Sequence, residues 1–590
     1  MPRGAISRDS SVSAVRLHRA RSFGSTGADA DPITTEVVRH GLNSAAEQMK
    51  RALVRTSFSP VIYEILDFAA ALYDRHGRML AQAPSNPLFM GTLDFCIAGA
   101  TEAIGGSKAW RAGDIVLINV PYVTGSHQQD AGVVAPAFVD EELIGYAAIK
   151  AHWQDMGAKD PYCTDTVDVF QEGIIFPGVK LYDAGVRVEA VHQIVLANTR
   201  MPEMVGGDID AEVVGVRTGV GALEHLVRRF GRDVFWGSVE RMFDHGERTM
   251  RARLATLRDG RYQAMGRMDS NGVDEGAVEF EISVEIDGSD VVVDFTQAPP
   301  SSRGPVNSPL PCTVAVSRVA LAMLAGQHES PNDGHFRPLS VATRLDTIFD
   351  PSSPAPCYLN GWLAMQAIDV IHRALAGAAP SLIPAGSGGC ICGVVWWGNR
   401  DGQEPWSDST GHPIGQGAHK GRDGAHSLMH LGEAGSRFAS AEVFEARYPL
   451  LWKKVELATD SAGAGRWQGG LGVDAALVAL DDASVTCVVE RTAFPPWGLD
   501  GGASARANEA TLRLTDGSSV ACSKATALHV PLGATLEIKT GGGGGFGDPS
   551  ERDVAAVLAD LEDGYISPEF ATSHYPHASA SSNARPMDDR

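Results

Sequence analysis

Two apolar, β-rich runs separated by a short polar turn stand out in the first third of the chain. The runs are Val133–Val139 and Leu143–Lys150, and the three residues between them are acidic. Runs of this length around a polar connection are typical of a β-hairpin. With Glu141 as the centre of the turn, Asp130 lies eleven positions before it and His152 eleven positions after it. The pattern therefore predicts that Asp130 and His152 face each other across two antiparallel strands.

A third polar side chain belongs to the same end of the predicted hairpin. His127 lies three residues before Asp130, so that it can fold back over the open end, and Asp155 repeats the His-x-x-Asp spacing from the second strand. Two imidazoles and a carboxylate can hold a divalent metal and leave positions open for water or substrate. The same residues at strand ends also serve as hydrogen-bonded loop anchors, and the spacing leaves both interpretations open.

The rest of the pattern predicts an α+β fold. Apolar residues from Val38 to Leu53 recur with helical spacing, and Thr34 or Thr35 is the expected N-cap. After residue 258 the period changes to the alternation of short strands. We therefore expect four regions: a disordered leader (1–30), an α+β metal-binding region with the hairpin (31–258), a β-rich, glycine-rich region (259–567) and a disordered tail (568–590).

Composition narrows the function. The 590-residue chain carries a formal net charge of −22, which argues against nucleic acid as a partner. It contains no run of 18 apolar residues, so we expect no membrane span. Its eight cysteines are too scattered for a disulfide framework, which favours a reducing compartment and hence the cytoplasm. The Ser- and Arg-rich first 30 residues also suit a transit peptide, although a disordered leader is the preferred interpretation.

Four further features carry possible chemistry. Asp67 stands at the start of an apolar run, where a buried carboxylate needs a partner. Glu172 is either a general base or the cap of a turn. Five consecutive glycines at 541–545 allow an anion-binding nest, a hinge or a packed turn. A glycine-rich stretch contains histidines that we expect on a mobile surface loop, although one of them could carry protons; they are His412, His419, His426 and His430.

Several phrases of the sequence resemble the hydantoinase B/oxoprolinase family. The similarity extends from about residue 31 to about residue 567, with the motifs in order. They include DFAAALYDRHGRMLAQAP, DIVLINVPYVTGSHQQDAGVVAP, AHWQDMGAKDPY, VFQEGIIFPGVKLY, FPPWGLDGG and GGGGGFGDPSERD. The family contains the B-type component of ATP-dependent N-methylhydantoinase, one half of 5-oxoprolinase, and related subunits of acetone and acetophenone carboxylases.

The resemblance implies a division of labour. A hydantoinase A-type partner would bind ATP and phosphorylate a carbonyl oxygen of a small cyclic amide, and this chain would complete the hydrolysis at a divalent metal (Mn, Zn, Fe or Mg). No Walker-type phosphate loop occurs in the sequence, in agreement with that division. The family's metal ligands would fall on His127, Asp130 and His152, and also on Asp67, with Asp155 or Glu172 as the catalytic proton acceptor. The Gln128-Gln129 pair within the ligand loop leaves the substrate contacts open.

Three alternatives to this amidohydrolase remain. The first is a subunit of an ATP-dependent ketone carboxylase, which would act on a ketone and need bicarbonate. The second is an oxygenase in which two histidines and one carboxylate hold ferrous iron. The third is a structural subunit whose polar cluster is bonded only to itself.

Overall fold

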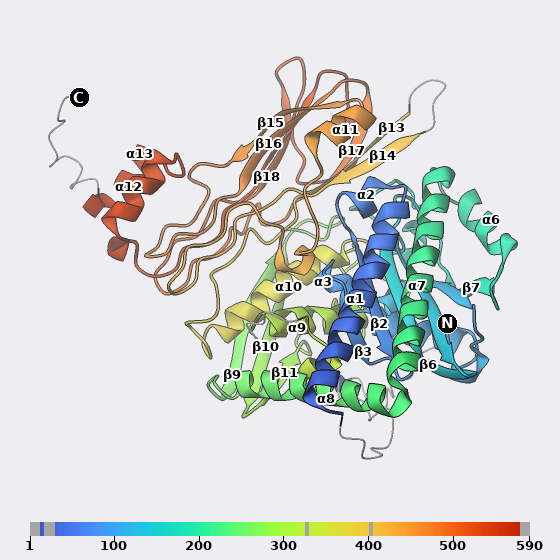
Figure 1. Ribbon diagram of the computed structural model, residues 1–590. Helices are drawn as coiled ribbons and strands as arrows, with labels where there is room; N and C mark the ends of the chain where they lie inside the picture. The colour runs from blue at the N-terminus through green and yellow to red at the C-terminus, as the bar shows by residue number, and fades with distance from the viewer. Residues whose placement is uncertain (1–11, 17–29, 325–329, 400–404, 579–590) are drawn as a thin grey trace, which may run out of the picture.

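The computed structural model describes residues 12–16, 30–324, 330–399 and 405–578. It confirms an α+β fold with four β-sheets (Figure 1). No helix among the described residues is long and apolar enough to cross a membrane.

The predicted hairpin lies in the middle of a seven-stranded antiparallel sheet. Its strands, in spatial order, are β3 (Met79–Gln82), β2 (Phe68–Asp74), β6 (Glu142–His152), β5 (Asp130–Val139), β4 (Ile115–Ile118), β7 (Pro177–Asp183) and β8 (Val186–Arg187). Side chains of β6 alternate between two cores: Ala147 and Ile149 face helices α1 (Pro32–Thr56) and α7 (Pro202–Phe230), and Tyr146 and Ala148 face the opposite side. Lys150 and His152 share the face of Tyr146 and Ala148, because side chains two apart on a strand point the same way.

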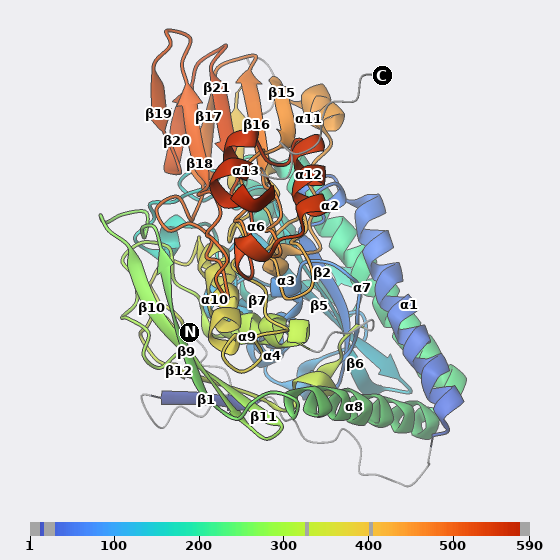
Figure 2. The same cartoon turned by 90° about the vertical axis from the view of Figure 1, so that its left-hand side faces the viewer.

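That second face is covered by other helices, and Figure 2 shows the layers in order. Beyond the sheet lie α3 (Pro87–Met90), α4 (Leu93–Ala103), α9 (Leu310–Leu324) and α10 (Asn360–Leu375), and then a five-stranded sheet. The strands of that sheet are β1 (Val12–Arg16), β12 (Leu339–Arg344), β11 (Asp290–Asp294), β10 (Val278–Asp287) and β9 (Gly260–Met268). Helix α8 (Arg232–Leu254) contacts both α1 and strand β11 of this sheet. One hydrophobic core extends across the predicted boundary at residue 258, with Tyr146 and Val316 both in it.

Two smaller sheets form the C-terminal part. One contains β14 (Trp406–Thr410), β13 (Gly393–Gly398), β17 (Ala483–Val488) and β20 (Lys524–Val530). The other contains β15 (Leu450–Leu457), β16 (Val473–Ala479), β21 (Thr535–Lys539), β18 (Glu509–Arg513) and β19 (Ser519–Ala521). The shorter helices of the chain are α2 (Pro60–Tyr63), α5 (Pro121–Thr124), α6 (Glu189–Ala197), α11 (Ala441–Arg447), α12 (Val554–Glu562) and α13 (Pro568–His574).

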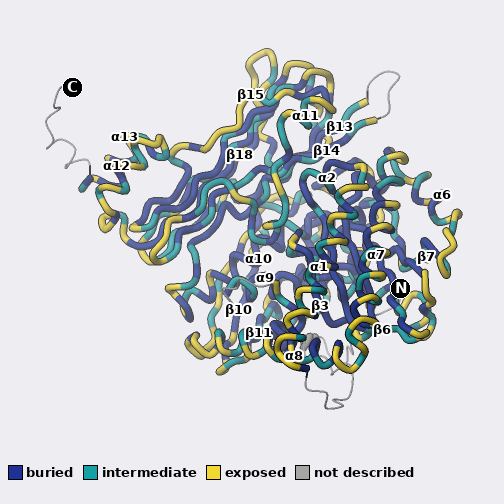
Figure 3. The backbone as a smooth tube through the Cα atoms, viewed as in Figure 1, coloured by how far each residue is buried: buried dark blue, intermediate teal, exposed yellow. Residues whose placement is uncertain are grey.

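The five-glycine segment is neither an anion-binding nest nor a hinge. It runs beside other extended segments between the last sheet and α12–α13 (Figure 1), and these segments are buried over most of their length (Figure 3). Gly543 N donates to Gly470 O at 2.8 Å, Gly544 N to Gly386 O at 2.8 Å and Gly545 N to Ala503 O at 3.0 Å. Because backbone carbonyls already occupy these amide groups, the glycines bind neighbouring chain segments and not an anion.

The expected disorder at both ends is wrong where the structure describes it. Val12–Arg16 pairs with the edge of β12, which would otherwise be free. The unpaired backbone groups of that edge bind the segment despite the polar composition of the leader. Residues 1–11 and 17–29 lie outside the described residues. In the tail, α13 is a helix, and the fully buried Tyr575 accepts a hydrogen bond from Gly465 N at 3.2 Å. An aromatic anchor therefore fixes the segment as far as residue 578, and residues 579–590 lie outside the described range.

Candidate metal centre

The hairpin has the register that the sequence predicts at its open end. Asp130 pairs with His152, and the turn is made by Asp140 and Glu141, which both adopt the left-handed conformation (φ 50° and 64°). This two-residue turn alone would shift the pairing by one position, but a register shift between Ala137 and Phe138 restores it. Asp130 and His152 therefore point to the same face of the sheet.

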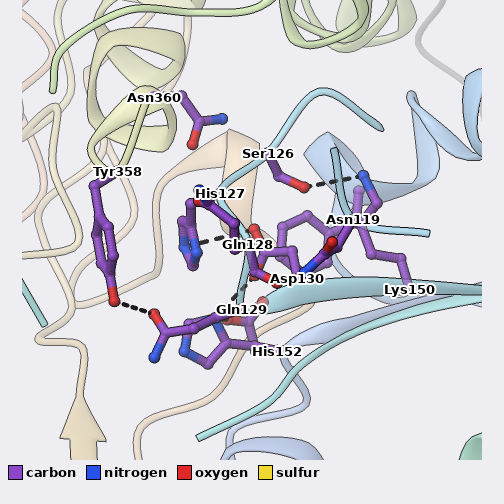
Figure 4. A network of polar contacts seen from close by, with 12 residues as sticks. Asn119, Ser126, His127, Gln128, Gln129, Asp130, Lys150, His152, Tyr358 and Asn360 are labelled. Atoms are coloured by element: carbon purple, nitrogen blue, oxygen red, sulfur yellow. Dashed lines mark hydrogen bonds and ion pairs between the residues drawn. The ribbon is translucent and has the colours of Figure 1, made fainter. Parts of the chain in front are cut away.

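The three predicted ligands meet at this end of the hairpin (Figure 4). The Nδ1 atom of His152 lies 2.9 Å from Asp130 Oδ1, and His127 Nε2 lies 3.5 Å from Asp130 Oδ2. Ligand-capable atoms of the three residues all lie within 4.8 Å of one another, and all three residues are buried. The spacing is that of groups that can close around one cation.

Asp67 completes the cluster from the loop before β2. Its Oδ2 lies 4.0 Å from His152 Nδ1, and its Oδ1 accepts a hydrogen bond from Asn86 Nδ2 at 2.8 Å. The backbone of His152 also donates to Asp67 O at 3.1 Å, which ties the loop to the end of β6. All four residues predicted as metal ligands are thus brought together.

The His127 loop is held by aromatic and amide side chains. The Tyr358 ring stacks on the His127 imidazole at 5.1 Å between centroids, and the Tyr358 hydroxyl donates to Gln129 Oε1 at 2.6 Å (Figure 4). Gln129 Nε2 donates to Gln154 O and Pro161 O. Gln128 Nε2 donates to Val169 O at 2.8 Å. The two glutamines therefore brace the loop through backbone carbonyls.

The charges and pKa shifts in the cluster favour the binding of a cation. Burial lowers the pKa of His127 to about 4, so its imidazole is neutral, as a metal ligand must be. Burial also acts to lower the pKa of His152, but the hydrogen bond and charge of Asp130, with the charge of Asp67, raise it. Burial raises the pKa of Asp67 to about 6. Because carboxylates this close to one another are held away from water, a divalent cation would offset a local excess of negative charge.

The cluster lines a cavity of about 110 Å³, which has room for several water molecules at about 10–15 Å³ each. Its wall is mixed: the four predicted ligands form one part, and apolar side chains such as Phe89, Trp362 and Met365 form another. Glu433, which no sequence pattern singles out, also lines the cavity. Its acidic neighbours lie far away in sequence, so no local spacing could have found it.

The two predicted catalytic carboxylates are not at this cavity. Asp155 accepts hydrogen bonds from the Arg200 backbone and guanidinium, both at 2.5 Å, and so anchors the chain ahead of α7. Glu172 accepts from the backbone amides of Cys357 and Tyr358, each at 2.9 Å. Neither lines the cavity, and each is held by donors of its own. The positions of the two carboxyls therefore lend no support to the prediction that they act as proton acceptors on a substrate in this cavity.

The expected surface loop of histidines is also wrong for two of its members. His412 and His430 are fully buried, His412 Nδ1 lies 2.8 Å from Cys392 O, and His430 Nε2 lies 3.2 Å from Asp369 Oδ1. Backbone and side-chain partners from distant segments bury them, which a glycine-rich local sequence does not reveal.

The buried carboxyl of Glu172 predicts a dependence of stability on pH. Burial raises its pKa to about 8, although the amides of Cys357 and Tyr358 and the Thr166 hydroxyl oppose the rise. A raised folded-state pKa stabilises the fold below the ordinary pKa of glutamate, and that contribution is lost as pH rises through about 8. We expect the melting temperature of the wild type to fall between pH 5.5 and pH 8.5 by more than that of Glu172→Gln. Parallel pH profiles in thermal unfolding would contradict this assignment.

A set of two imidazoles and two carboxylates at a cavity, with three of the four residues buried, is typical of a metal-dependent enzyme. Comparison with known proteins makes the class specific: the chain belongs to the Hydantoinase B/oxoprolinase family, whose match covers residues 31–549. It is 30% identical to the B-type component of a putative D-/L-hydantoinase from Pseudomonas sp. (strain NS671), over 92% of this chain and 95% of that protein.

Two solved structures share the fold. The ATP-dependent caprolactamase from Pseudomonas jessenii superposes with a TM-score of 0.87 at 28% identity, covering 92% of this chain and 96% of that one. An acetone carboxylase superposes with a TM-score of 0.83 at 18% identity, covering 92% and 79% of the two chains. The second likeness shows the fold alone.

Proposed function

We propose that this chain is the B-type subunit of an ATP-dependent amidohydrolase that opens a hydantoin-like or lactam ring. A hydantoinase A-type partner would bind ATP and phosphorylate the ring carbonyl, and this chain would complete the hydrolysis in the cytoplasm. The observation that carries the proposal is the convergence of His127, Asp130 and His152 at a buried cavity. Names of relatives support it, because they include the B-type component of a putative hydantoinase and the beta component of a caprolactamase.

The residues present fit a divalent cation. Two imidazoles and a carboxylate stand within 4.8 Å, Asp67 stands beside them, and His127 is held neutral by burial. His127, Asp130, His152 and Asp67 would hold the ion. As a Lewis acid, such an ion would polarise an oxygen atom of the substrate and lower the pKa of a bound water molecule. Two side chains of the protein orient the imidazole rings. Asp130 orients the His152 ring through their hydrogen bond, and Tyr358 orients the His127 ring by stacking on it. The apolar wall excludes bulk water from the reacting ring.

The first test measures metal and turnover together. Wild type and His127→Ala, each co-purified with the hydantoinase A-type partner, would be compared by elemental analysis and by ATP-dependent ring opening of hydantoins and lactams. We expect wild type to hold close to one equivalent of a divalent metal, and His127→Ala to lose most of that metal and at least about 100-fold of the turnover. Metal content unchanged in the variant would remove the proposed site.

A ketone carboxylase subunit is the second candidate, since an acetone carboxylase shares the fold. Bicarbonate separates the two, since a carboxylase hydrolyses ATP productively only when bicarbonate and a ketone are both present. ATP-dependent ring opening without bicarbonate supports the amidohydrolase. Dependence on a ketone and bicarbonate supports the carboxylase.

A further inference from the structure

A carboxyl group outside the proposed ligand set stands on the cavity wall. Glu433 ends the short 3-10 helix Leu431–Glu433, which follows β14 in sequence and contacts α3 in space. The other ionisable side chains at the cavity, apart from the four proposed ligands, are Tyr162 and Cys312. Among the described residues that line the cavity, Glu433 is therefore the carboxyl that remains available to act on a bound ring.

The carboxyl of Glu433 is held by donors on one oxygen. Asn86 Nδ2 donates to Glu433 Oε2 at 2.5 Å and also to Asp67 Oδ1 at 2.8 Å, so one amide joins the two acids. Ser436 Oγ donates to the same Oε2 at 3.4 Å. Among the described residues no hydrogen bond reaches Oε1, and the side chain is only partly buried. One carboxyl oxygen is thus fixed, and the other is free to meet a ligand in the cavity.

The segment before Glu433 has its own buried anchor. Gly432 N donates to His430 Nδ1 at 3.0 Å, which makes Nε2 the protonated nitrogen, and Nε2 lies 3.2 Å from Asp369 Oδ1. Asp369 is bonded in turn to Arg491 at 2.9 Å and to Ser387 at 2.8 Å. This network holds the turn against α10 independently of the hairpin, so Glu433 faces the hairpin cluster from a rigid support.

Glu433 is set to carry a proton. Glu433 lines the cavity beside the proposed ligands, and among the described residues its Oε1 accepts no hydrogen bond, so a proton on this oxygen can pass directly to a bound ring. Ring opening needs such a group, because an amine nitrogen leaves carbon poorly unless it is protonated as the bond breaks.

We propose that Glu433 is a catalytic acid of the ring-opening reaction and delivers its carboxyl proton to the ring nitrogen as the carbon–nitrogen bond breaks. The inference rests on the proposed function. Water has by then added its oxygen to the ring carbon. As the carbon–nitrogen bond breaks, its electron pair stays on nitrogen, which takes the proton of Glu433, and the carbon forms a carbonyl bond to the added oxygen, whose proton passes to solvent. The carboxylate of Glu433 regains a proton from solvent before the next turnover. No redox partner is needed. Asp155 and Glu172 do not line the cavity, and Tyr162 and Cys312 are the rival proton donors among the described residues that do.

Leaving-group dependence tests the assignment. Glu433→Gln, Glu433→Asp and Tyr162→Phe would each be purified with the hydantoinase A-type partner. Each would be assayed on a lactam, whose leaving nitrogen is a basic amine, and on a hydantoin, whose leaving nitrogen belongs to a weakly basic ureide. We expect Glu433→Gln to lose about 10²–10⁴-fold in kcat on the lactam and much less on the hydantoin. Glu433→Asp should keep more of the lactam activity, and Tyr162→Phe should change both rates in similar proportion.

Metal content and thermal unfolding of each variant complete the test, and both should match wild type. An equal loss on the two substrates would overturn the inference, as would loss of metal from Glu433→Gln, which would make Glu433 a ligand. A substrate-selective loss in Tyr162→Phe would assign the proton to the phenol. If wild type opens neither ring with ATP, the proposed function fails and the inference with it; if wild type opens them and the selectivity is absent, only the inference fails.

Discussion

Replacement of Gly543 by alanine is expected to prevent the accumulation of folded protein. A Cβ atom at this position would lie 1.9 Å from Gln416 O and 2.1 Å from Gln416 C, distances at which backbone must move. Movement is opposed on both sides, because Gly543 N donates to Gly470 O and Gly543 O accepts from Gly463 N. Substitutions that force buried backbone apart belong to the exceptional class of about 4–5 kcal/mol or more. Soluble yield and thermal unfolding measure the effect.

A matched alanine substitution at Gly221 provides the control. Gly221 lies inside α7, where an added Cβ meets nothing within 4 Å. Alanine there removes backbone freedom from the unfolded chain, so Gly221→Ala should be more stable by about 0.5–1 kcal/mol. If Gly543→Ala unfolds at the same temperature as the wild type, the close packing of the glycine segments is wrong.

The glycine segments show a limit of reading a sequence locally. Five glycines in a row indicate that the backbone must approach something closely, and three interpretations fitted that requirement. The choice among them depends on partners such as Gln416, Gly470 and Ala503, which lie up to 127 positions away along the chain (543 − 416). No periodicity within 541–545 encodes those partners.

The pairing of the hairpin strands could be predicted, because two departures from the expected turn cancel each other. A three-residue connection centred on Glu141 gives the pairing of Asp130 with His152, and that pairing is observed. The connection is in fact a two-residue turn, and the register shift near Ala137 and Phe138 supplies the missing position. The pairing register determines which face each side chain takes, since a slip by one residue would have turned His152 away from Asp130.

The proton-carrying side of the site could not be predicted. Asp155 was selected for its spacing from His152, yet Arg200 occupies it. Glu433 has no motif of its own and reaches the cavity only because Asn86 and the anchor at His430 hold it there. Spacing along the sequence can identify site residues that belong to one supersecondary unit, such as the hairpin. A residue that a distant segment contributes to the cavity wall can be identified only from the tertiary fold.

The second large effect is expected from Lys150, which the sequence presents as one residue of an apolar strand. Its side chain is fully buried, and Nζ donates to Thr92 Oγ1 at 2.6 Å, Thr124 O at 2.5 Å and Ser126 Oγ at 3.1 Å. Figure 4 places it beside the cluster, where it lies two positions before His152 on the same face of β6. It thereby joins the second hairpin strand to the turn that leads into His127.

Lys150→Met is therefore expected to weaken both the fold and the proposed metal centre. Three acceptors lose a charged donor at about 1–3 kcal/mol each, and relief from burying an ammonium offsets part of that loss. We expect a net decrease of about 2–4 kcal/mol in the free energy of unfolding. We also expect metal affinity to fall by about 10–100-fold, because the His127 turn loses its tie to β6.

Denaturant unfolding and metal titration of the purified chain check the two effects separately. Thr92→Val removes one acceptor of Lys150 and also the hydrogen bond that the Thr92 hydroxyl donates to Phe89 O, and it keeps the ammonium bonded to Thr124 O and Ser126 Oγ. It should therefore cost about 2 kcal/mol and leave metal affinity nearly unchanged. This comparison separates loss of hydrogen bonds at Thr92 from loss of the tie between β6 and the His127 turn. Wild-type metal affinity in Lys150→Met would show that the His127 turn keeps its position through the Tyr358 stack and the Gln128–Gln129 braces alone.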